Sequence, residues 1–196
     1  MKILQIGTGS ANDDLSDIIK DQQPEILILV EPLKVHNTSI RECYKHVKNK
    51  HLLNLAISTR DLAFTTEDGE KVIFYHHLDD GPLFEVAGTS KEHIIKHGLD
   101  PDRIVQSNVK SIRINQLLEK YQLNMLDILY IDAEGNDDDI IKDLDLDKYL
   151  VKNIYFENLH LENNDIFRFL ENKGYEITPY TGKNGWTSMA TLQRLL

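Results

Sequence analysis

The chain has 196 residues, of which 41% are hydrophobic and 28% charged, and its formal net charge is −10. This length and composition suit one globular domain, and the negative charge disfavours nucleic acid and anionic membranes as partners. A membrane span needs about 20 consecutive apolar residues, and no run in the sequence approaches that length. The single cysteine, Cys43, excludes an internal disulfide. Because the N-terminus also lacks an apolar leader, we expect a cytoplasmic protein.

Strand and helix patterns alternate along the first third of the chain. Residues 2–6 and 25–30 are runs of strand-forming apolar residues, and residues 15–19 between them have helical spacing. A mixed helical segment then leads to a third predicted strand at residues 52–57. Strand–helix–strand alternation of this kind predicts right-handed crossovers and a parallel sheet.

The middle of the chain has a different pattern. Residues 62–65 and 72–75, joined through a turn that contains Gly69, predict a β-hairpin. Residues 78–109 are rich in glycine and proline and contain one short helical piece near residues 90–97. We expect this segment to be a substrate-side insertion over the edge of the sheet, within a single domain that spans residues 1–196.

The second half returns to strand and helix patterns. A helix at residues 112–121 precedes residues 126–131, a nearly continuous apolar run that runs directly into Asp132, Glu134 and Gly135. Such a run fits a strand buried on both faces, and open α/β sheets bind ligands at the carboxyl ends of such strands. Helix, strand, helix and an antiparallel hairpin at residues 175–180 and 188–192 complete the prediction.

Three acidic or glycine-rich strand ends together predict a nucleoside-type cofactor. Gly7 and Gly9 follow the first strand, Glu31 follows the second, and the paired acids follow the fourth. A dinucleotide is disfavoured because Asn12 replaces the third glycine of the fingerprint and the next two residues are aspartates, which repel a pyrophosphate. S-adenosyl-L-methionine (SAM) has no phosphate, and its cationic sulfonium suits acidic surroundings.

These residues resemble the FkbM family of SAM-dependent methyltransferases. The strongest match is residues 112–135, where a helix and an apolar strand lead into Asp-x-Glu-Gly. Weaker matches are Glu31-Pro32, residues 54–58, Phe156-Glu157 and residues 174–177. The resemblance implies a Rossmann-like class I methyltransferase fold of the α/β class. It has a mostly parallel seven-stranded sheet, helices on both faces and an antiparallel C-terminal hairpin. It also implies SAM as cofactor and O-methylation of a sugar or other small hydroxyl acceptor.

The same resemblance gives a set of expected site residues. The residues expected at the cofactor are Gln5, Gly7, Gly9, Ser10, Glu31, Pro32, Ile57, Ser58 and Asp132. Asp132, Glu134 and His160 are the candidates for removing the acceptor's proton, and Glu157 is a further one. Asp137 and Asp138 could join Asp132 and Glu134 as oxygen ligands of Mg²⁺ or Ca²⁺. An acidic helix start explains them better, so no metal site is predicted.

Two other functions stay open at this point. Gln5 stands where the family usually has an acid, and the glycine turn departs from the family pattern, which would suit a non-catalytic binding module with the same fold. A nucleotide-sugar or NAD-linked α/β enzyme is the other alternative. The identity of the acceptor and the formation of a homo-oligomer cannot be read from one sequence.

Overall fold

The computed structural model describes residues 1–59, 62–79, 86–159, 161, 164–182 and 185–193. Its larger sheet has the strand order β10-β11-β9-β8-β1-β2-β3. The strands are β1 (Lys2–Ile6), β2 (Ile26–Val30), β3 (Lys50–Leu53), β8 (Met125–Ile131), β9 (Leu150–Glu157), β10 (Tyr175–Tyr180) and β11 (Thr187–Leu192). Neighbours from β3 to β9 pair in parallel, whereas β11 is antiparallel to both β9 and β10. The predicted mostly parallel sheet and terminal hairpin are therefore confirmed.

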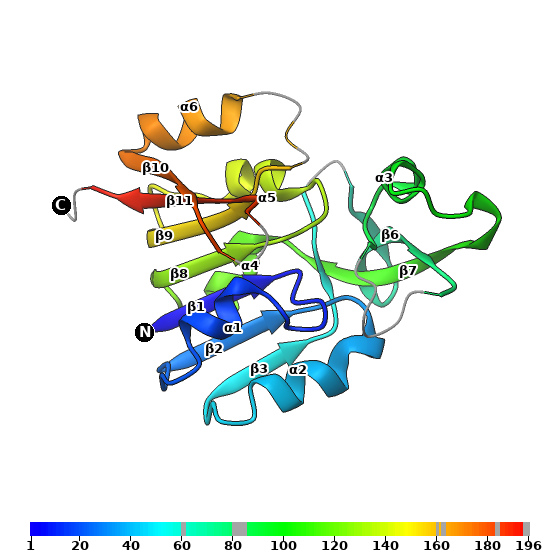
Figure 1. Cartoon of the computed structure of the whole chain (residues 1–196), viewed down its shortest axis with the longest axis horizontal. Coiled ribbons are helices and arrows are strands. Elements are labelled where there is room, and N and C mark those ends of the chain that lie inside the picture. The colour runs from blue at the N-terminus through cyan, green and yellow to red at the C-terminus, as the bar shows by residue number, and fades with distance from the viewer. Residues whose placement is uncertain (60–61, 80–85, 160, 162–163, 183–184, 194–196) are drawn as a thin grey trace.

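Helices cover both faces of this sheet (Figure 1). They are α1 (Asp14–Ile18), α2 (Asn37–Cys43), α4 (Ile114–Lys120), α5 (Asp137–Asp143) and α6 (Asp165–Asn172), with a 3₁₀ turn η1 (Lys34–His36) before α2. Alternate strand side chains enter two separate hydrophobic clusters: Ile3 of β1 packs towards α1 and α2, and Leu4 packs towards α4, α5 and α6. This two-sided burial explains why the strands read as continuous apolar runs.

A second sheet lies beyond the carboxyl ends of β1, β2 and β8, whose arrows point towards it in Figure 1. Its order is β4-β7-β6-β5, from β4 (Ala56–Ile57), β5 (Phe64–Thr66), β6 (Gly69–His77) and β7 (Ile104–Ile112). The predicted hairpin is β5–β6, and the predicted helical piece is α3 (Lys91–Lys96), which a 3₁₀ turn, η2 (Pro101–Arg103), follows. The segment expected as a simple insertion thus supplies helix α3 and most of β7.

The third predicted strand is wrong in one respect, because residues 52–57 belong to two sheets. Residues 52 and 53 end β3, and residues 56 and 57 form β4, which pairs in parallel with β7. Asn54 lies at the break, where its amide nitrogen donates to the Glu31 backbone carbonyl at 3.0 Å and its side chain exchanges hydrogen bonds with that of Asn37. These contacts hold the backbone after β3 and direct the chain away from the larger sheet.

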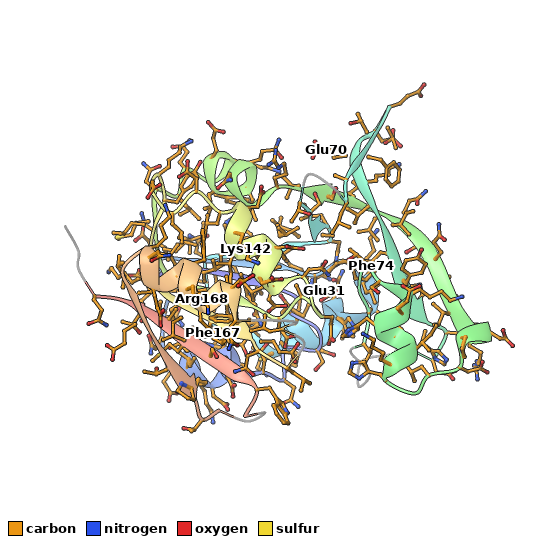
Figure 2. All side chains as sticks on the ribbon, turned by 90° about the horizontal axis from the view of Figure 1, so that it is seen from above. Glu31, Glu70, Phe74, Lys142, Phe167 and Arg168 are labelled. Atoms are coloured by element: carbon orange, nitrogen blue, oxygen red, sulfur yellow. The ribbon has the colours of Figure 1, made fainter. Side chains whose placement is uncertain are left out.

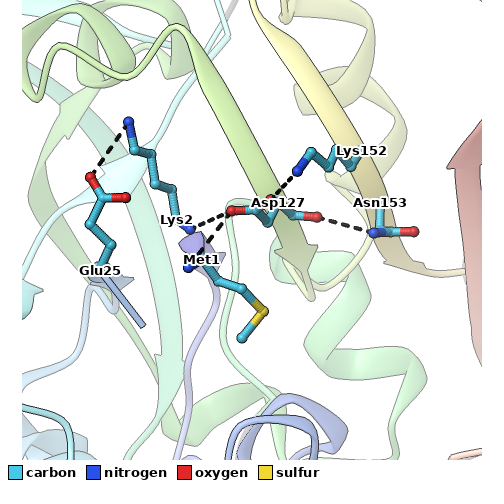
Figure 3. Close-up of polar contacts among 6 residues, drawn as sticks. All are labelled: Met1, Lys2, Glu25, Asp127, Lys152 and Asn153. Carbon is cyan, nitrogen blue, oxygen red and sulfur yellow. Dashed lines mark hydrogen bonds and ion pairs between the residues drawn. The ribbon is translucent and has the colours of Figure 1, made fainter. Parts of the chain in front are cut away.

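The opposite end of the larger sheet is fastened by Asp127 (Figure 3). Its carboxylate accepts a hydrogen bond from the Lys2 backbone N–H at 2.7 Å and pairs with the Lys152 ammonium at 2.6 Å. Its backbone carbonyl accepts a hydrogen bond from the Asn153 side chain at 3.2 Å. Asp127 therefore ties β1, β8 and β9 together at the end away from the strands' carboxyl termini.

Candidate functional site

The carboxyl ends of β1, β2 and β8 enclose a pocket together with the second sheet. Its empty volume, including the open mouth, is about 890 Å³. Glu31 lines it from the larger sheet, and Phe74 and Thr89 line it from the second sheet and the segment that follows. Figure 2 shows Glu31 and Phe74 in the region where the two sheets meet. The pocket lies where open α/β sheets bind their ligands.

The turn after β1 requires glycine at position 7. Gly7 has φ +73°, and a Cβ built on it would lie 1.6 Å from the backbone carbonyl oxygen of Asp132. The Gly7 N–H donates to the Val30 carbonyl at 3.0 Å, and the Asp132 N–H donates to the Ile6 carbonyl at 2.9 Å. The absence of a side chain therefore lets the ends of three strands converge on the pocket.

Glu31 fixes the loops after β1 and β2. Its carboxylate accepts hydrogen bonds from the Gly9 backbone N–H at 2.8 Å and from the Leu33 backbone N–H at 2.7 Å. The residue is only 5% exposed but lines the pocket. Glu31 therefore fixes both loops while its carboxylate faces the pocket.

Gln5 lies below the pocket rather than in its wall. Its side chain is fully buried, donates a hydrogen bond to Asp13 and accepts one from the Tyr44 hydroxyl at 3.1 Å. Asp13, whose other oxygen accepts the Ser16 N–H at 3.0 Å, does line the pocket. Gln5 therefore contacts the pocket only through Asp13, whose carboxylate it holds.

Four carboxylates gather around the ends of β8 and β9. Burial, followed by the negative charges of Glu157 and Asp137, raises the pKa of Asp132 well above its usual value. Burial also raises the pKa of Glu157 to about 8, with contributions from Glu134 and Asp137. Asp137 accepts the backbone N–H groups of Ala133 and Glu157, both at 3.1 Å, and burial raises its pKa to about 7. Asp137 therefore braces β8 against β9, and its oxygens are engaged with backbone.

Glu134 occupies a left-handed backbone position, with φ +50°, and lies at the border of two cavities. One of its carboxylate oxygens is 2.7 Å from Nε2 of His93 on α3. Its side chain is 20% exposed and that of His93 is 10% exposed. Non-glycine residues in this conformation carry strain that surrounding structure must offset, and they cluster at functional sites.

The structure brings most of the sequence-predicted site together. The residues that line the pocket as expected are Gly7, Gly9, Glu31, Pro32, Ile57, Asp132 and Glu134. Gln5, Ser10 and Ser58 do not line it; Ser58 is 1% exposed and its backbone N–H pairs with the Ile112 carbonyl. His160 lies outside the described residues, so its expected role stays a prediction.

Sequence reasoning missed several residues of the pocket and its border. Asp13, His36, Phe74, Thr89 and Asn136 line the pocket, and His93 contacts Glu134. Most of them gave no signal, because only tertiary folding brings the second sheet and η1 to the strand ends. The spacing of His93 and His97 is the exception, because histidines four residues apart share one face of a helix.

The strand order and the pocket at the carboxyl ends of β1, β2 and β8 define a Rossmann-like α/β protein with the class I methyltransferase fold. Residues 9–177 match the family model described as the Methyltransferase FkbM domain. The chain belongs to this family of methyltransferases, as its sequence predicted. No curated protein gives a significant match. Within the described residues, no helix has the length and apolar character needed to cross a bilayer.

Proposed function

We propose that the protein transfers the methyl group of SAM to a hydroxyl oxygen of a sugar or other small acceptor. The observation that carries this proposal is the charge of the pocket wall. Asp13, Glu31 and Glu134 line the pocket beside Asp132, and the described part of its lining contains no lysine or arginine. Such a wall attracts a cationic ligand and repels a phosphate.

The lining fits SAM in three places. Glu31 would accept hydrogen bonds from ribose hydroxyls, as an acid after the second strand does in related sheets. The backbone at Gly7 and Gly9 allows close approach of the ligand. Asp13, held by Gln5, offers a carboxylate to the methionine ammonium. When bound, SAM supplies an electrophilic methyl group on a sulfonium.

The remaining wall would receive the acceptor. Phe74 and Thr89 approach from the side of the second sheet, opposite the strand ends. An acceptor held there in line with the methyl group gains much of its rate from positioning alone. Asp132 and Glu134 are the carboxylates within the pocket wall that can take the hydroxyl proton.

Calorimetry with S-adenosylhomocysteine tests the cofactor. The native chain should bind it, and Glu31→Gln should weaken binding about 10–100-fold because hydrogen bonds to a charged group contribute roughly 1.5–3 kcal/mol. Glu25→Gln is the matched control, since Glu25 precedes the same strand at its other end and is 66% exposed. A thermal melt of each variant checks that the fold is intact. Absence of binding at about 1 mM would refute the proposal, and binding of NAD instead would favour the dinucleotide enzyme.

Turnover separates the enzyme from a non-catalytic relative. Transfer of labelled methyl from SAM to a panel of glycans and small alcohols should give product with the native chain. Asp132→Asn should lower the transfer rate by about 100-fold or more, the scale of general-base catalysis, while S-adenosylhomocysteine still binds. Cofactor binding without transfer to any hydroxyl acceptor would favour the binding module.

A further inference from the structure

Two histidines of the second layer meet a carboxylate from the larger sheet. His93 and His97 are four residues apart, on the last turn of α3 and its C-terminal cap, and Glu134 follows β8. One donor atom from each residue lies within 4.8 Å of the other two. The rings of His93 and His97 are 4.7 Å apart between centroids. Two elements that are distant in the sequence thus present three metal-binding groups at one point.

The geometry is near that of a metal-bound state. Zn²⁺ binds histidine nitrogen and carboxylate oxygen at about 2.0–2.2 Å, which places tetrahedral donors roughly 3.3 Å apart. His93 Nε2 and the Glu134 oxygen are 2.7 Å apart, so they need to separate by only about half an ångström. His97 is exposed at the C-terminal cap of α3, and its donor atom already lies within 4.8 Å of the other two.

We propose that His93, His97 and Glu134 bind a divalent transition-metal ion, with Zn²⁺ as its representative. Imidazole nitrogens favour Zn²⁺ and its neighbours, whereas Mg²⁺ and Ca²⁺ require mostly oxygen ligands. Histidines at i and i+4 of a helix with a carboxylate from elsewhere form a set of three protein ligands, which leaves a fourth position open. The proposal does not depend on which methyl acceptor the protein uses.

The surroundings suit a cation with an exchangeable ligand. The three residues line a second cavity together with Asn136, Asp138 and Asp139, and the acids add negative charge next to the site. Lys96 also lines this cavity, on the exposed side of α3. Glu134 lines both cavities, so a metal ion held by its carboxylate would lie near the wall of the pocket. This assignment leaves Asp132 as the carboxylate for the acceptor's proton.

Zinc titration of the full chain without a purification tag tests the site. Calorimetry and metal analysis after dialysis should give one Zn²⁺ per chain, and Mg²⁺ should neither bind tightly nor compete. His93→Ala and His97→Ala should each weaken Zn²⁺ binding by more than the roughly 10–100-fold that loss of an outer partner costs. Glu134→Gln should also weaken it, because the amide keeps the shape of the side chain without its charge.

His76→Ala is the matched control, because His76 lies on β6 in the same layer but is not among the three ligands. It should bind Zn²⁺ as the native chain does. Co²⁺ in place of Zn²⁺ should give a visible absorption band that disappears in His97→Ala. Because His97 is exposed, this substitution should leave the fold intact, so loss of the band would not be due to misfolding. The proposal is overturned by failure to bind one equivalent of Zn²⁺, by full binding in His97→Ala, or by equal loss in His76→Ala.

Discussion

Replacement of Gly7 by alanine tests how closely β1 and β8 converge at the pocket. The new Cβ would lie 1.6 Å from the Asp132 carbonyl oxygen, whereas ordinary contacts begin near 3.4 Å. The two backbones would therefore have to separate, which weakens the hydrogen bond from the Asp132 N–H to the Ile6 carbonyl. A left-handed conformation costs a residue with a side chain about 1–2 kcal/mol. Overpacking adds roughly 1–3 kcal/mol and the weakened hydrogen bond about 1 kcal/mol.

We expect Gly7→Ala to lower the free energy of unfolding by about 3–6 kcal/mol. Gly98→Ala is the control, because Gly98 has φ +78° but nothing within 4 Å of its built Cβ. It should lose only the conformational part, about 1–2 kcal/mol. Urea denaturation followed by far-ultraviolet circular dichroism measures both, with the m value checking that the transition is unchanged. Equal losses in the two variants would refute the close approach.

Three further predictions concern charge and packing. The pKa of Glu157 is raised to about 8 in the folded chain, against 4.5 unperturbed. Between these two pH values the folded state retains a proton that the unfolded state releases. The free energy of unfolding should therefore fall as pH rises from the lower value to the higher. Glu157→Gln should flatten that fall by on the order of 1–2 kcal/mol in melts across the range; an unchanged slope would contradict it. Partial desolvation raises the pKa of Asp127, but hydrogen bonds from Lys152 and the Lys2 amide lower it overall. The ionised Asp127 therefore stabilises the fold at any pH above the ordinary pKa of an aspartate, and this stabilisation is lost as pH falls through the lowered pKa of the folded state. Asp127→Asn should lower the free energy of unfolding by about 1 kcal/mol at pH 7, and the difference between variant and native chain should vanish in acid. Phe74→Ala, at a site 7% exposed, should cost about 3 kcal/mol in urea denaturation, and a loss below 1 kcal/mol would show that this side chain is not packed.

The larger sheet was predictable because its strands are buried on both faces. Residues 128–131 read as a continuous apolar run since Ile128 and Tyr130 enter one hydrophobic cluster and Leu129 and Ile131 enter the other. Strand β7 has no such run: its side chains alternate between half-buried and exposed, and few are large and apolar. A strand in a partly solvated sheet gives a weaker signal, and its pairing with β6 depends on contacts far along the chain.

The part of the candidate site that lies at the ends of the larger sheet's strands was also predictable from the sequence. Glu31 and Asp132 follow strands that lie parallel in one sheet, so their convergence follows from topology alone. Asp13, Phe74 and His93 reach the site through a buried glutamine, a second sheet and a short helix, respectively. No local pattern encodes those approaches. Gln5 illustrates the difference, because its position on β1 was predicted correctly while its side chain bonds Asp13 and Tyr44 and does not line the pocket.

The two points where the chain leaves and re-enters the methyltransferase core lie side by side. Ala56 pairs with Ser111 and Ile57 with Ile112, so the second sheet begins and ends at one short parallel bridge between β4 and β7. Changes in the length of the segment between these junctions therefore need not alter the register of β1, β2 and β8, which pair within the larger sheet. If the proposed function is correct, exchange of this module between relatives would change the acceptor side of the pocket and leave the ends of β1 and β2 as they are.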